Sequence, residues 1–303
     1  MPHPGLVWPV PAGTPITDQP SMPSFDVHQH LWPEELIAAL ANRREMPRIR
    51  GSMLELAEGR FEVDLDAHRL DRRLEQLDRD GVDVAIVSFP PTMGWESARE
   101  LAVAFHEGIE RLAGESRGRL RAFACGECRP GYAGACVSGR RLIAGVAGLA
   151  SELADAGQAL FIHPGPPEPV PTDAPPWWTA VVDYTAQMQA AFAWWINQGP
   201  EAAPGVPVVF AILGGGAPFQ LERLRGRGGP EAQSLLDTNV FLDTASYGHR
   251  ALELCLSTYG VRALLYGSDV PVVDPRPTLQ ALIGFGDAVK DVVMTENPTA
   301  LFG

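Results

Sequence analysis

Short apolar runs alternate with helical patterns along most of the chain. Runs rich in β-branched and aromatic residues, each ended by glycine, proline or polar residues, predict strands. The predicted strands cover residues 24–30, 82–89, 119–126, 135–138, 159–163, 206–213, 239–243 and 263–268. Between them, apolar residues recur every three or four positions, as in 67–77 and 101–112, which predicts amphipathic helices. A longer apolar stretch over 177–197 predicts a helix packed on more than one face.

This alternation predicts the fold class. Strands that alternate with helices favour a parallel sheet, and eight of them without a linker favour closure into one barrel. We therefore expect an α/β protein with a (β/α)8, TIM-like barrel over residues 24–303. The first 23 residues differ, because prolines at positions 2, 4, 9, 11, 15, 20 and 23 prevent a regular helix or central strand. We expect residues 1–23 to form an extended arm that packs on the body or on a neighbouring subunit, which leaves a homo-oligomer open.

The charge balance excludes several classes of partner. The chain has 24 Lys and Arg residues against 37 Asp and Glu residues, a net charge of −13. Such a chain repels phosphate backbones and anionic membranes, and no basic patch offsets this, so neither nucleic acid nor a membrane is an expected partner. No run approaches the ~20 apolar residues of a membrane span, and the first residues lack the features of a signal peptide. With four cysteines that we expect to be reduced, the expected location is the cytoplasm.

Candidate metal ligands end three of the predicted strands. His28 and His30 occupy positions i and i+2 of the first strand, so both imidazoles are expected on one face. His163 ends the strand over 159–163, and Asp269 follows the last strand. The C-terminal ends of the strands are where barrel enzymes of this kind have their active sites. Asp26 lies one step deeper than His28, where it either supports the ligands or is a buried structural carboxylate.

These motifs resemble those of the amidohydrolase-2 family, the branch of metal-dependent amidohydrolases that includes carboxymuconate-semialdehyde and resorcylate decarboxylases. The likeness covers about residues 24–303. It includes the Asp-x-His-x-His start, Gly-Val-Asp at 81–83, His-Pro at 163–164, Gly-Ser-Asp-x-Pro at 267–271 and a closing Asn-x-x-x-Leu-Phe.

The resemblance implies one divalent metal ion, usually zinc, with manganese or magnesium as alternatives. His28, His30, His163 and Asp269 would hold it, with a water completing the shell. Neutral imidazoles and one carboxylate suit such an ion, which activates bound water near neutral pH. The only lysine is Lys290, which favours a single ion over a lysine-bridged pair. Asp269 would also be catalytic, taking a proton from the water and returning it to the leaving group, or helping to protonate carbon in a decarboxylase.

The sixth predicted strand departs from the family's pattern. Family members carry a catalytic histidine there, in an Ala-His-x-Gly-Gly context, whereas this chain has Ala-Ile-Leu-Gly-Gly at 211–215. The side chain of Ile212 can neither give nor accept a proton. Three hypotheses follow: Asp269 and the metal suffice, His249 substitutes as a catalytic residue, or the barrel binds a metal without efficient catalysis. The alternative for His249 is a surface histidine at a helix terminus.

Substrate contacts are predicted from loops that follow the strands. Phe89 and Trp95 could form an aromatic wall, and Trp178 and Tyr184 could cover the opening, with core packing as the alternative for each. Arg50, in the long loop after the first strand, could bind a substrate carboxylate through two hydrogen bonds, with a solvated loop arginine as its alternative.

The function expected first is therefore that of a metal-dependent hydrolase acting on a C–N or C–O bond of a small organic acid or its derivative. One alternative is a non-oxidative carboxy-lyase that acts on a small aromatic acid. The other is a metal-binding pseudoenzyme or ligand sensor, because Ile212 replaces the histidine. In each case the partner is a small molecule.

Overall fold

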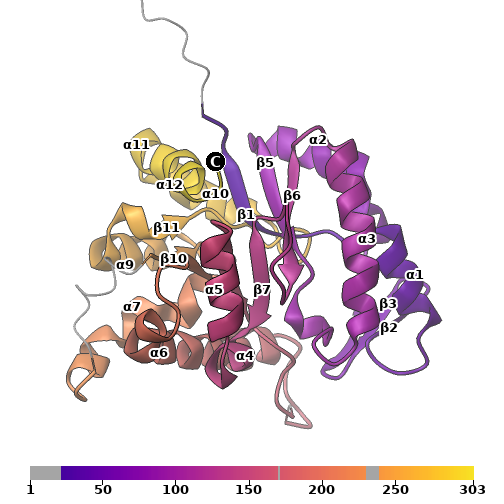
Figure 1. The fold of residues 1–303 in the computed structure, drawn as a ribbon, viewed down its shortest axis with the longest axis horizontal. Coiled ribbons are helices and arrows are strands. Elements are labelled where there is room, and N and C mark those ends of the chain that lie inside the picture. The colour runs from indigo at the N-terminus through magenta and orange to yellow at the C-terminus, as the bar shows by residue number, and fades with distance from the viewer. Residues whose placement is uncertain (1–21, 170, 230–238) are drawn as a thin grey trace, which may run out of the picture.

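A computed structural model describes residues 22–169, 171–229 and 239–303. Eight parallel strands form its main sheet, in the order β1-β5-β6-β7-β8-β9-β10-β11, and each lies within one of the eight predicted segments or begins one residue before it. They are β1 (Phe25–His30), β5 (Val84–Ser88), β6 (Leu120–Cys125), β7 (Gly134–Ser138), β8 (Ala159–His163), β9 (Val208–Phe210), β10 (Val240–Asp243) and β11 (Leu264–Leu265). The sheet stands at the centre of the molecule with helices outside it (Figure 1).

Hydrogen bonds between β1 and the segment after β11 close this sheet into a barrel. Val27 N–H donates to the Tyr266 carbonyl at 2.8 Å, and His30 N–H donates to the Val270 carbonyl at 2.7 Å. Gln29 and Val270 form a parallel bridge at the same place. The predicted α/β barrel is therefore confirmed, with a seam where β11 itself is only two residues long.

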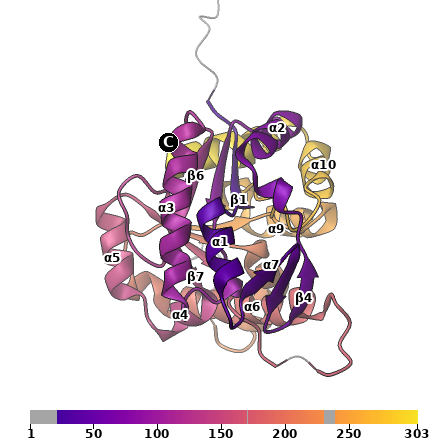
Figure 2. The same ribbon diagram turned by 90° about the vertical axis from the view of Figure 1, so that its right-hand side faces the viewer.

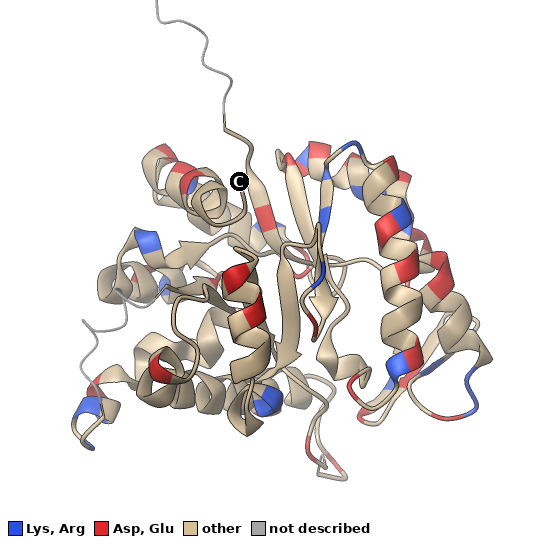
Figure 3. Cartoon of the chain, in the orientation of Figure 1, with Lys and Arg blue, Asp and Glu red and all other residues tan. Residues whose placement is uncertain are grey.

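The helices cover the outside of the barrel. They are α1 (Glu34–Asn42), α2 (Leu70–Asp80), α3 (Arg99–Glu115), α4 (Gly139–Ala144), α5 (Ala147–Asp155), α6 (Tyr184–Ala202), α7 (Ile212–Arg225), α9 (His249–Tyr259), α10 (Arg276–Gly284), α11 (Asp287–Asp291) and α12 (Asn297–Phe302). Short 3-10 turns are η1 (Leu65–His68), η2 (Pro91–Met93) and η4 (Val261–Ala263), and wider turns of π type are η3 (Thr179–Asp183) and η5 (Val292–Glu296). The apolar stripe predicted over 101–112 is buried on α3. Figure 3 shows charges of both signs interspersed on α2 and α3.

The long loop predicted after the first strand is instead partly a small sheet. Residues 48–62 form an antiparallel sheet of β2 (Arg48–Arg50), β3 (Met53–Leu56) and β4 (Gly59–Glu62). Its strands have three or four residues, too few for an alternating pattern to stand out in the sequence. The sheet lies at the same end of the molecule as α6, where the barrel strands end (Figures 1 and 2).

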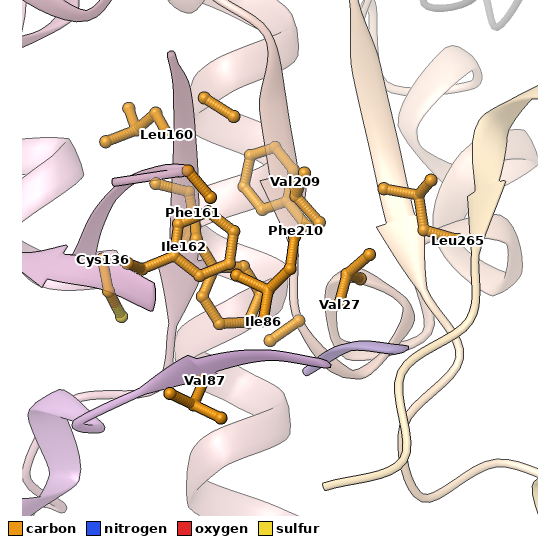
Figure 4. Close-up of a cluster of buried hydrophobic side chains, with 14 of the residues drawn as sticks. Val27, Ile86, Val87, Cys136, Leu160, Phe161, Ile162, Val209, Phe210 and Leu265 are labelled. Carbon is orange, nitrogen blue, oxygen red and sulfur yellow. The ribbon is translucent and has the colours of Figure 1, made fainter. Parts of the chain in front are cut away.

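The interior of the barrel is filled with apolar side chains. Phe161 and Phe210 are fully buried, as are Val27 and Ile86 from neighbouring strands (Figure 4). Phe161 stacks on Phe123 with ring centroids 4.9 Å apart. Side chains pack the centre, as in other barrels of this size, so chemistry is left to the ends of the strands.

Two further predictions concern the N-terminal arm and membrane spans. The proline-rich arm predicted over 1–23 lies outside the described residues, apart from Met22 and Pro23, which are exposed. Among the described helices, none combines the length and the apolar character needed to cross a bilayer.

The first testable prediction concerns Gly134 at the start of β7. Its φ is +154°, and a Cβ there would lie 1.8 Å from the Ala159 backbone oxygen in β8. Gly134→Ala should therefore lower the free energy of unfolding by about 3 kcal/mol or more, since backbone of the paired strand must move. Gly131→Ala is the matched control, because Gly131 has φ +81° with nothing within 4 Å, and should cost about 1–2 kcal/mol. Urea unfolding of both variants measures this, and equal losses would contradict the steric explanation.

Candidate metal centre

Three buried histidines meet at the C-terminal ends of β1 and β8. The ring centroids of His28 and His30 lie 5.1 Å apart, those of His28 and His163 5.1 Å, and those of His30 and His163 5.3 Å. One nitrogen from each ring lies within 4.8 Å of the others. The Nε2 atoms of His28 and His30 are 3.3 Å apart.

The other nitrogen of each ring faces a hydrogen-bond acceptor. His28 Nδ1 lies 2.7 Å from Asp243 Oδ2, His30 Nδ1 lies 3.0 Å from the Ser88 carbonyl, and His163 Nδ1 lies 3.0 Å from the Pro164 carbonyl. With a metal bound, each Nδ1 would donate its proton to this acceptor, and the neutral ring would offer the lone pair of its other nitrogen as a ligand. Lone pairs that converge in this way repel one another unless a cation lies between them. The donor set fits a divalent metal ion, and the acceptors on Nδ1 are of the kind that orient ligating histidines.

Asp269 adds a carboxylate to the same place. Its Oδ1 lies 3.1 Å from His30 Nε2 and 3.7 Å from His28 Nε2, and its own N–H donates to the His28 carbonyl at 2.8 Å. Its φ of +64° turns the chain sharply after β11, a conformation that aspartate tolerates better than most residues. The Asp269 side chain is 15% exposed, against 0% for His28, so it can meet a substrate. Burial opposes ionisation, but the hydrogen bond with His30 and the nearby imidazoles hold the pKa of Asp269 below its ordinary value.

Asp243, at the end of β10, holds His28 in place. Its Oδ2 accepts from His28, and its Oδ1 accepts the backbone N–H groups of Ile212 and Ala245, both at 3.0 Å. Burial alone would lower the pKa of His28, but the Asp243 carboxylate outweighs burial and raises that pKa to about 9. Without a metal, a proton on His28 thus relieves the crowding of lone pairs. Asp243 was not among the predicted site residues, although it ends a predicted strand as His163 does, and that position was the signal available in the sequence.

Asp26 contacts the backbone of the ligand-bearing segments and not the rings. Its Oδ1 accepts the N–H of His28 at 3.2 Å and that of Ser268 at 3.0 Å. It is fully buried, and burial raises its pKa to about 6. Asp26 is therefore a buried structural carboxylate, and through its hydrogen bonds it also supports the segments that carry the candidate ligands.

The first five residues of α7, where the family's histidine would stand, form a left-handed turn in place of regular α-helix. Residues 212–216 have φ values between 47° and 81°. Three glycines adopt this conformation freely, but for the β-branched Ile212 it is strained. The Ile212 N–H is held by Asp243, and its half-buried side chain packs against the core. No acid or base is offered at this position.

His249 and Arg50 make contacts of their own away from the three rings. His249 is exposed and stacks on Phe285 with ring centroids 4.2 Å apart. Arg50 donates to the carbonyls of Ala41, Ile49 and Arg43, so its guanidinium joins β2 to the end of α1. Neither side chain has a contact with the three histidines among the described residues.

The aromatic residues predicted at the opening divide into two groups. Phe89 and Trp95 are fully buried, and Trp95 Nε1 donates to the Phe89 carbonyl at 3.0 Å, so these two rings belong to the core. Trp178 is half-buried beside Trp177. Tyr184 donates to Glu58 Oε1 at 2.8 Å, which ties the start of α6 to the turn between β3 and β4.

Comparisons with known proteins bear on the fold. No protein-family model and no curated protein matches the chain. Solved structures do match it over nearly its whole length. IDCase from Metarhizium anisopliae is 17% identical, with 94% of this chain and 98% of that chain covered and a TM-score of 0.72.

Two solved structures that contain manganese are also similar to this chain over nearly its whole length. A dihydroxybenzoic acid decarboxylase from a Polaromonas species, with bound manganese and the inhibitor 2-nitroresorcinol, is 16% identical (93% and 97% covered, TM-score 0.65). A 5-carboxyvanillate decarboxylase from Novosphingobium aromaticivorans, with manganese and a nitrobenzoic acid, is 15% identical (94% and 97% covered, TM-score 0.68). At these identities the likeness establishes the fold, a TIM barrel shared with these enzymes.

Removal of one ring tests the metal centre. His163→Ala should bind zinc or manganese at least tenfold more weakly, because the site loses one of its three imidazole ligands. Elemental analysis after metal loading and gel filtration measures this. His249→Ala is the matched control and should keep the wild-type metal content. Full occupancy in His163→Ala would remove this residue from the ligand set.

The role of Asp243 is tested by a change of charge at constant size. Asp243→Asn should weaken metal binding about 10–100-fold, the usual effect of losing the partner of a ligating histidine. The two oxygens of the Asp243 carboxylate accept three N–H donors, whereas an amide has only one acceptor oxygen. Competition with a coloured chelator gives the affinity, and unchanged affinity would show that His28 needs no anionic partner.

Proposed function

We propose that this protein is a metal-dependent carboxy-lyase of the amidohydrolase-2 type, which removes CO₂ from a small aromatic acid. The convergence of His28, His30, His163 and Asp269 at the mouth of the barrel is the observation that carries the proposal. The fold shared with decarboxylases of dihydroxybenzoic acid and 5-carboxyvanillate supports decarboxylation over the hydrolysis that the sequence analysis placed first.

In this proposal His28, His30, His163 and Asp269 would hold a single divalent ion through imidazole nitrogens and a carboxylate oxygen. Manganese is bound in two of the similar structures, and zinc fits the same donors. When bound, such an ion supplies a Lewis acid that neutralises and orients the oxygens of an acidic substrate.

Asp269 is the residue proposed to move the proton. Loss of CO₂ breaks the bond between the ring carbon and the carboxylate, and that carbon must gain a proton. A protonated Asp269 gives its proton to the ring carbon; the carboxylate then leaves as CO₂, and its bonding electrons restore the aromatic ring. Because the pKa of Asp269 lies below its ordinary value, the carboxylate must take up a proton from solvent before each turnover. Ser246 Oγ, 3.4 Å from Oδ2, orients the carboxyl group.

Ile212 and His249 take no part in the proposed proton transfer. Ile212 stands where the family has a histidine, and the exposed His249 stacks on Phe285. The proposal therefore assigns proton transfer to Asp269 alone.

A two-part substrate panel tests the reaction. Manganese- or zinc-loaded protein is incubated with hydroxylated benzoic acids, including 2,6-dihydroxybenzoate and 5-carboxyvanillate, while CO₂ release is measured. A parallel panel of esters, lactones and amides is followed by acid release. We expect CO₂ from the first panel and no acid from the second. Acid release alone would establish the hydrolase, and turnover of neither panel would leave a metal-binding protein without catalysis.

A variant of Asp269 tests the assignment of the proton. Asp269→Asn should lower kcat by about 10²–10⁴-fold at saturating metal, because the amide cannot carry the proton. His249→Asn serves as the control and should retain the wild-type kcat. An Asp269→Asn enzyme that releases CO₂ at the wild-type rate would exclude this role.

A further inference from the structure

Arg73 is a fully buried arginine in α2 that reaches the ligand-bearing end of β1. Its exposed fraction is 0%, although arginine is rarely buried completely unless it is paired. No carboxylate lies within ion-pair distance of Arg73 among the described residues. A buried cation without a direct counter-ion is costly, so its hydrogen bonds show what it stabilises.

The Arg73 guanidinium contacts two adjacent residues at the end of β1, the side chain of one and the backbone of the next. Nη1 donates to Gln29 Oε1 at 2.7 Å, and Nη2 donates to the His30 carbonyl at 2.9 Å. A longer contact of 3.4 Å joins Nη2 to the Ala67 carbonyl. Arg73 therefore holds the backbone of one candidate ligand directly and the side chain of its neighbour.

Gln29 passes this contact on to Asp26. Gln29 Nε2 donates to Asp26 Oδ2 at 2.7 Å, and the other Asp26 oxygen accepts the N–H groups of His28 and Ser268. Ser268 directly precedes Asp269. The chain Arg73–Gln29–Asp26 thus contacts the backbone at or beside three of the four candidate ligands.

The strand at this point is irregular, which is why it needs support. From Asp26 to Gln29 β1 advances by three residues, while the paired β5 advances by two, from Ala85 to Val87. Such a bulge leaves backbone groups out of the regular ladder and changes the direction of nearby side chains. His28 lies within this bulge, and Asp26 accepts its N–H.

We infer that Arg73 is a positioning residue, which holds the bulged end of β1 so that His28, His30 and Asp269 face one metal ion. The inference rests on the proposed function only in requiring that these residues bind a metal. Arg73 touches neither metal nor substrate, and acts through Gln29, Asp26 and the His30 carbonyl.

The experiment compares metal affinity and ligand geometry in folded protein. Arg73→Met keeps the length of the side chain but removes its donors, and Gln29→Leu breaks the link to Asp26 while leaving Arg73 in place. Both should bind Co²⁺ about 10–100-fold more weakly than wild type, with a changed visible absorption spectrum of the bound ion. Arg73→Lys should recover part of the affinity, because its ammonium group can still donate to Gln29 or to the His30 carbonyl but lacks the planar fork that holds both.

His106→Gln separates positioning from general loss of stability. His106 is buried in α3 and accepts the Cys125 N–H at 2.9 Å, so this variant is also expected to be destabilised, yet His106 supports β6 and not β1. It should keep the wild-type cobalt affinity and spectrum. Circular dichroism confirms folding at the assay temperature, and if Arg73→Met does not fold, Gln29→Leu and Arg73→Lys carry the comparison.

The outcomes separate this inference from the proposed function. The positioning role would be overturned if folded Arg73→Met kept the wild-type affinity and spectrum. If Arg73→Met does not fold, the same result in both Gln29→Leu and Arg73→Lys would overturn it. A wild-type protein that binds cobalt but releases no CO₂ would refute the proposed function and leave the comparison valid. A wild-type protein that binds no metal would overturn both.

Discussion

The hydrogen bonds between β1 and the segment after β11 are the constraint on which the fold and the site both depend. They close the barrel through the carbonyls of Tyr266 and Val270, because β11 is too short to close it as a regular strand. The same contacts place β1, with two of the histidines, beside the turn that carries Asp269. Barrel closure and the geometry of the site therefore depend on the same contacts, and a change that loosens the seam would affect both stability and chemistry.

The site gathers groups that would repel one another in the absence of a cation. Three buried imidazoles and a carboxylate meet at the ends of the barrel strands. The protein holds them there with buried partners on their far sides: Asp243 for His28, and backbone carbonyls for His30 and His163. Such an arrangement costs folding free energy that a bound ion would return, as is usual where binding residues are organised before the ligand arrives.

Much of the barrel was predictable because its signals are local. Each strand is a short apolar run bounded by turn residues, and each candidate ligand ends or follows one. The small sheet over 48–62 was not predictable, since its strands are too short to show periodicity. The predicted pocket residues Phe89 and Trp95 lie in the core, and Arg50 bonds to backbone carbonyls, because the direction of a loop side chain depends on neighbours distant in sequence.

The sequence by itself determined the order of the barrel strands and of the helices between them, and which histidines could share a strand face. Those properties depend on residue type and spacing over a few positions. Only the tertiary structure decided that Asp243 holds His28, that β1 bulges between Asp26 and Gln29, and that Arg73 is buried against its end. These contacts join residues up to 215 positions apart, and the local pattern that predicts a helix or strand contains no information on which buried polar groups will meet.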